Sequence, residues 1–157
     1  MNKFLPILFV ILFGFGTATK ATGNECDQVS ENPENGVFSL ECINSVLINY
    51  VTYKPSGFFI LSLSNEESIY VQGIKDIGNS FLFEAVGPEF TNALSSGTLK
   101  SLLNLGWDFP DNSSNYSKIL QIDEIFSGAA AQLVFETLKS YDSDPQKVKF
   151  TYTISDL

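Results

Sequence analysis

The sequence contains no histidine and no arginine, so its nine positive charges are all lysines. Without histidine it lacks the usual neutral-pH proton shuttle and the commonest metal ligand. Without arginine it lacks the planar group that holds phosphate or carboxylate through two hydrogen bonds. Histidine-based hydrolytic triads are therefore excluded. A Ser-Lys dyad stays formally possible, and Ser117 and Lys118 are adjacent in the sequence. We expect a protein that is not an enzyme and that carries no cofactor.

Long apolar runs are also missing, because the run Phe4–Phe15 is shorter than the ~20 residues of a membrane-spanning helix. Lys3 precedes this run and small residues follow it at 17–21. That order is typical of a secretory signal peptide, with an uncleaved membrane anchor as the alternative. We predict a signal peptide over residues 1–21 and export to the periplasm or the extracellular space, with no membrane association after cleavage.

Positive charge is scarce as well, with nine lysines against eighteen carboxylates and a net charge of −9. The predicted leader holds two of the lysines, Lys3 and Lys20, and no acidic residue. Its removal leaves a net charge of about −11, which repels nucleic acid and anionic lipid. We therefore expect no nucleic-acid partner.

Two cysteines are present, Cys26 and Cys42. In an exported protein they would pair, and a disulfide across a loop of about seventeen residues stabilises the fold by about 3 kcal/mol in the chain-entropy model. The bond would attach the polar N-terminal segment 22–36 to a single domain over residues 37–157. Two free thiols acting as nucleophile or metal ligands are the alternative, but they lack a basic partner and further ligands.

Apolar periodicity predicts an α+β fold of two layers: a helix, a three-stranded antiparallel meander, two helices and a C-terminal strand. The first strand, FFILSLS, is apolar on both faces in its first half. This pattern is typical of a doubly covered strand, or of a strand with one face left open to receive something. The predicted elements are a helix over 38–53, strands over 58–64, 68–74 and 80–86, helices from 95 or 96 to Gly106 and over 125–141, and a strand over 148–154.

Acidic and amide side chains offer few sites for chemistry. Glu84 interrupts an apolar strand, so it is either a poised acid, a receptor for a ligand's amine, or a solvent-facing side chain. Asp108 and Asp111 lie close together but lack the spacing of a calcium loop, and we predict no metal site. Asn112 and Asn115 match the glycosylation pattern, which matters only in a eukaryotic secretory pathway.

The single tryptophan, Trp107, follows the glycine that should end a helix, and Pro110 prevents an immediate restart. One interpretation is a structural plug, in which the indole folds over the helix end and its N–H finds a backbone carbonyl. The other is a partner-binding groove lined by Trp107, Phe109 and Tyr116.

Five segments occur together in one order: YVQ at 70–72, FEAVG at 83–87, LSSGTLKSLLNLGWDFP at 94–110, NYSK at 115–118 and AAQLVFETL at 130–138. Together they resemble the TY-Chap domain, which is grouped with the YbjN-like, type III secretion chaperone-like proteins of bacteria. The resemblance implies an α+β fold with a helix, a three-stranded antiparallel meander and further helices. It also implies a binding role, since such chaperones are small, acidic, often dimeric proteins that hold partner polypeptides in partly extended form. Such relatives are generally cytoplasmic, whereas this chain carries a predicted leader.

We therefore expect an exported bacterial module that binds protein or peptide, with homodimerisation left open. The alternatives are a small secreted carboxylate-dependent hydrolase or effector, and a structural or toxin-like extracellular module. The candidate binding residues are Trp107, Phe109, Tyr116, Tyr70 and Glu84.

Overall fold

The computed structural model describes residues 39–53, 55–63, 66–88, 90–91, 95–109, 115–141 and 150–155. These residues form a mixed α+β fold with one antiparallel sheet, as the sequence pattern predicted. In chain order the elements are α2 (Leu40–Tyr53), β1 (Phe58–Leu63), β2 (Glu66–Lys75), β3 (Ser80–Ala85), α3 (Ser96–Asn104), β4 (Tyr116–Gln121), α4 (Ile122–Phe126), α5 (Ala129–Tyr141) and β5 (Phe150–Ser155).

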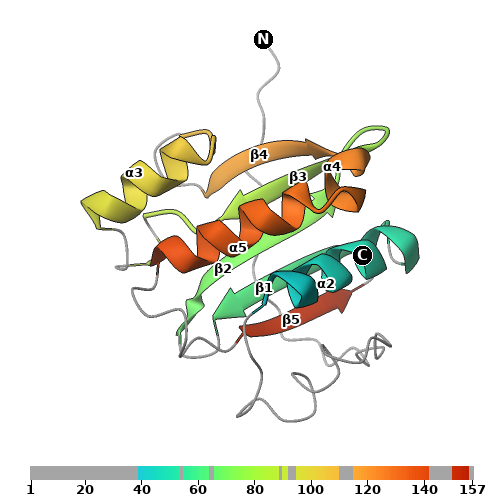
Figure 1. Ribbon diagram of the computed structural model, residues 1–157, viewed down its shortest axis with the longest axis horizontal. Coiled ribbons are helices and arrows are strands. Elements are labelled where there is room, and N and C mark those ends of the chain that lie inside the picture. The colour runs from blue at the N-terminus through green and yellow to red at the C-terminus, as the bar shows by residue number, and fades with distance from the viewer. Residues whose placement is uncertain are drawn as a thin grey trace.

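The sheet has five strands in the order β4-β3-β2-β1-β5, and all of its pairings are antiparallel. β1, β2 and β3 are spatial neighbours in chain order, which confirms the predicted meander. The C-terminal strand β5 lies beside β1, so the first and last described strands are adjacent (Figure 1).

Two predictions between Trp107 and Tyr141 are wrong. The segment between Gly106 and residue 125, where no helix or strand was predicted, contains β4, whose pairing with β3 makes it an edge strand of the sheet. The single helix expected after Asp123 is two helices, α4 and α5. They are separated at Gly128, whose φ of 84° lies in the left-handed region that other residues avoid.

The helices α2 and α5 lie side by side against one face of the sheet (Figure 1). Alternate strand residues point toward this helix layer, and in β1 and β3 the alternation is strict. Three aromatic rings pack together between the helices and the sheet: Phe59 meets Tyr50 and Phe83 edge-on, with ring centroids 5.1 and 5.0 Å away. Gly73 pairs with Phe59 across the strands, and a Cβ there would collide with the phenyl ring.

The short helix α3 has the predicted ends. Ser95 is its N-cap, and the Ser95 hydroxyl accepts a hydrogen bond from the Thr98 amide at 3.1 Å. Gly106 has a φ of 78° and reverses the chain after the helix, so that the amide of Trp107 donates to the carbonyl of Leu102 at 3.2 Å. Sequence-local signals therefore place the tryptophan directly against the helix end.

Candidate functional site

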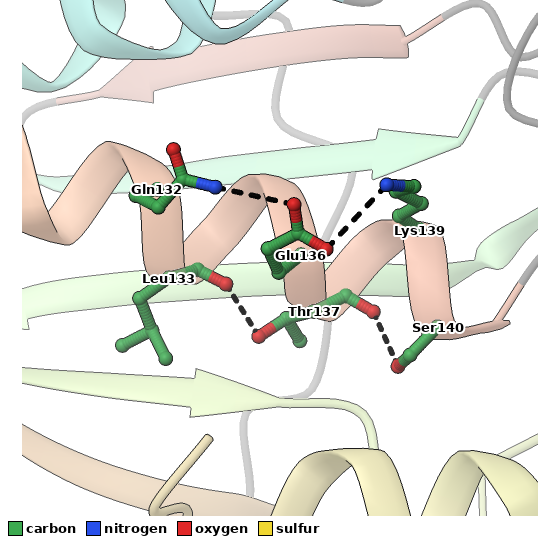
Figure 2. Close-up of polar contacts among 6 residues, drawn as sticks. All are labelled: Gln132, Leu133, Glu136, Thr137, Lys139 and Ser140. Atoms are coloured by element: carbon green, nitrogen blue, oxygen red, sulfur yellow. Dashed lines mark hydrogen bonds and ion pairs between the residues drawn. The ribbon is translucent and has the colours of Figure 1, made fainter. Parts of the chain in front are cut away.

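Trp107 is enclosed between α3 and α5, with 3% of its surface exposed. Its indole Nε1 donates a hydrogen bond of 2.8 Å to the hydroxyl of Thr137, where we had expected a backbone carbonyl. The Thr137 hydroxyl in turn donates to the carbonyl of Leu133 at 2.7 Å, a contact visible on α5 in Figure 2. The indole therefore fills the space between the helices and presents almost no surface to a partner.

The opposite side of α5 carries polar contacts along its length. The amide of Gln132 donates to Glu136 at 3.1 Å, and the ammonium of Lys139 lies 3.6 Å from the same carboxylate (Figure 2). Pairs at this spacing on an exposed helix face contribute only a few tenths of a kcal/mol, about 0.3 each. This side of α5 is an ordinary solvated helix face.

Tyr116 and Phe109 form an edge-on ring pair with centroids 5.9 Å apart. The Tyr116 side chain is fully buried, whereas Phe109 is 65% exposed. The Tyr116 hydroxyl has no hydrogen-bond partner among the described residues, and burial raises its pKa. Of the three aromatic residues predicted to line a groove, only Phe109 therefore offers a large exposed surface.

Tyr70 lies in the middle of β2, beside the point where β3 ends, and belongs to a polar junction there. Its hydroxyl accepts a hydrogen bond of 3.1 Å from the side-chain amide of Asn115, whose oxygen accepts one of 3.0 Å from the amide of Gly87. Burial raises the pKa of the Tyr70 phenol, and the nearby Glu84 carboxylate adds to this shift. Asn115, predicted as a glycosylation acceptor, thus uses both ends of its amide to join β2, the segment after β3 and the start of β4.

Glu84 lies on the face of the sheet that points away from α2 and α5, which we call the outer face. Its carboxylate accepts a hydrogen bond of 2.7 Å from the amide of Gln72, its cross-strand partner on β2. Among the outward-facing positions of β1 to β4 whose side chains are described, Glu84 is the one charged residue.

The outer face also carries a row of four large apolar side chains, one from each of β1 to β4, which we call the outer row. The register pairs Phe58 with Ile74, Ile74 with Leu82, and Leu82 with Ile119. Ile119 is 48% exposed, and the other three are half-buried. Neither α2 nor α5 covers this face (Figure 1). The apolar pattern of FFILSLS hinted at such a face, but only the strand register shows the row.

Among the residues that the structure describes, the other predicted groups do not assemble into reactive sites. Ser117 and Lys118 are consecutive strand residues whose side chains point to opposite faces, and Lys118 donates to the carbonyls of Leu105 and Gly106 at 3.0 and 3.1 Å. Asp111 lies outside the described residues, and the part of the chain that the structure describes contains no cluster of three metal-ligating side chains.

Cys42 is buried on α2, with 2% of its surface exposed, and it is not a free thiol. Its predicted partner Cys26 lies outside the described residues, as do the predicted leader, Pro110 and Asn112. The Cys26–Cys42 disulfide therefore stays a prediction.

No known protein family, curated protein or solved structure matches the chain. None of the helices within the described ranges has the length and apolar character needed to cross a membrane.

Proposed function

We propose that the protein is an exported, non-catalytic module that binds a polypeptide on the outer face of its sheet. The observation that carries the proposal is the outer row: four apolar side chains aligned across four strands, on the face opposite the α2–α5 layer. Apolar side chains grouped on a surface are typical of interaction sites. The resemblance to TY-Chap domains, whose relatives hold partner polypeptides, supports the same role.

The proposal moves the binding site away from Trp107. The indole and the Tyr116 ring are buried in the packing between helices and sheet, so they act on binding only through the fold. Glu84 stays in the proposed site because it lies on the same face of the sheet, in the row of side chains next to the outer row. A carboxylate-dependent hydrolase has less support, since the described partner of Glu84 is the amide of Gln72 and not a second acid.

The test is a binding assay with a panel of fluorescent peptides of about 15 residues, long enough for about four helical turns or an extended strand. Peptides bound by the protein should lose affinity by about tenfold for Leu82→Ser and for Ile119→Ser, the loss expected when one apolar contact is removed.

The matched control is Ile77→Ser, at a side chain that is 87% exposed in the turn between β2 and β3, outside the outer row. Circular dichroism of each variant checks that the fold is intact. Equal affinity of all three variants for every bound peptide would contradict the proposed site.

A further inference from the structure

We propose that the bound segment is a positively charged amphipathic α-helix that lies along the outer row, across the strands. This inference rests on the proposed function, because it names the partner of the same surface. Four observations on the described residues carry it: the spacing of the row, the state of the β4 edge, the charge of the face and its area.

The spacing of the outer row suits a helix. Neighbouring strands are about 4.8 Å apart, so the four side chains from Phe58 to Ile119 span about 14 Å. Successive turns of a helix repeat every 5.4 Å or so, and three intervals span about 16 Å. Same-side residues of an extended chain repeat at about 6.8 Å and span about 20 Å over three intervals. The difference in length between the outer row and three repeats of the peptide is therefore several times smaller for a helix than for an extended peptide.

The β4 edge discourages the alternative of strand addition. A strand that joins a sheet needs a series of unpaired backbone groups along the edge. At one end of β4, the carbonyl of Ser117 accepts a hydrogen bond of 2.9 Å from the amide of Asp108. At the other end, the amide of Gln121 donates to the Glu124 carboxylate at 2.8 Å. Between them, Ile119 is the single residue whose backbone N–H and C=O point away from β3 at the edge of the sheet. One residue is too short a segment for another strand to pair with.

The charge of the outer face selects a cationic partner. Glu84 lies in the row next to Leu82, and the Asp76 carboxylate lies 3.4 Å from the Ser80 hydroxyl at the end of β3. The two described lysines of these strands do not face the outer side. The ammonium group of Lys118 is engaged on the opposite face with the end of α3, and Lys75 pairs with Phe81, which points toward the helix layer. The chain as a whole has a net charge of −9. Lysine or arginine on the flanks of an apolar helix stripe would complement this arrangement.

The area of the face argues against a second copy of the chain as the occupant. Five strands at about 4.8 Å and three outward residues per strand at about 6.8 Å give a projected area of about 490 Å². A stable protein dimer buries about 800 Å² on each partner. Across the five strands the same face is about 24 Å wide, which is long enough for a helix of about 16 residues.

The experiment compares three synthetic peptides of about 15 residues by fluorescence anisotropy with the purified protein. The first places leucine at helical spacing with lysine on both flanks. The second replaces each lysine with glutamate. The third has the composition of the first, arranged as alternating leucine and lysine to favour a strand.

We expect the lysine helix to bind at least about tenfold tighter than either comparison peptide. Leu82→Ser should weaken its binding by about tenfold and Ile77→Ser should leave it unchanged. Glu84→Gln, which keeps the hydrogen bond to Gln72 but removes the charge, should weaken binding of the lysine helix more at low salt than at high salt.

Three results overturn the inference in distinguishable ways. If the alternating or the glutamate peptide binds as tightly as the lysine helix and loses affinity in Leu82→Ser, the partner chemistry is wrong and the proposed site stands. If neither Leu82→Ser nor Ile119→Ser changes the affinity of any peptide, both the inference and the proposed site are contradicted. A dimer in sedimentation analysis that Ile119→Ser dissociates would also overturn the inference, because the occupant would then be a second copy.

Discussion

Replacement of Trp107 by phenylalanine separates a structural from a binding role for the tryptophan. The indole is 3% exposed and donates to Thr137 at 2.8 Å. Phenylalanine forfeits this hydrogen bond, worth about 1 kcal/mol, and leaves a small cavity that costs about 1 to 2 kcal/mol more. We expect the free energy of unfolding to fall by about 2 to 3 kcal/mol.

A double-mutant cycle isolates the hydrogen bond within that total. Thr137→Val removes the acceptor while keeping the shape of the side chain, and it strands the buried indole N–H, at a cost of about 1 to 3 kcal/mol. The combination of Trp107→Phe with Thr137→Val should cost less than the sum of the single changes. We expect a coupling energy of about 1 kcal/mol between the two positions.

Urea unfolding followed by circular dichroism measures each variant, with the denaturant dependence as a check on two-state behaviour. The control is Phe109→Leu, at a ring that is 65% exposed, which should change stability by less than about 0.5 kcal/mol. The reasoning is refuted if Trp107→Phe leaves the unfolding free energy within about 0.5 kcal/mol of the original while peptide affinity falls about tenfold.

Three further predictions concern stability. Tyr116→Phe should leave the unfolding free energy unchanged or raise it, because it removes a buried hydroxyl without a described partner; a loss above about 1 kcal/mol in urea titration would contradict this. Burial raises the pKa of Tyr50, whose hydroxyl donates to Gly57, to about 12. The unfolded chain therefore loses that proton first, and stability should fall by up to about 3 kcal/mol as pH rises from about 10 to 12. Urea midpoints across that range should show a smaller fall in Tyr50→Phe. Dithiothreitol should lower the unfolding free energy by about 3 kcal/mol if Cys26 and Cys42 are paired, and it should have no effect in the double serine variant.

The parts of the fold that the sequence predicted are those specified by local signals. β1 and β3 alternate strictly between buried and half-buried residues, and α3 carries both a capping serine and a terminating glycine. β4 could not be predicted because two of its residues break the usual alternation of apolar side chains toward the core and polar side chains away from it. Lys118 occupies a position that faces the helices, and Ile119 faces outward. The lysine is satisfied there only by the end of α3, a tertiary contact that no strand periodicity reveals.

The candidate site was predicted less well, because it depends on contacts between distant segments. The partner of the Trp107 indole is Thr137, thirty residues further along the chain, so burial of the tryptophan could not be derived from its neighbours. Likewise Ile74, Leu82 and Ile119 are unremarkable as single apolar residues. They become a surface only when the register of β2, β3 and β4 aligns them.

The outer row is not a requirement of the sheet itself. The register of the strands is set by their buried face, since a slip of one residue would turn Phe59 and Phe83 out of the core. The next row on the outer face pairs Ile60 with Gln72, Gln72 with Glu84 and Glu84 with Ser117, so three of the same four strands accept polar side chains there. Folding therefore leaves the outer residues free to vary in polarity. An acidic chain that nevertheless aligns four apolar side chains on this face has a surface suited to contact with another molecule, which is the physical basis for the binding site that we propose on the outer row.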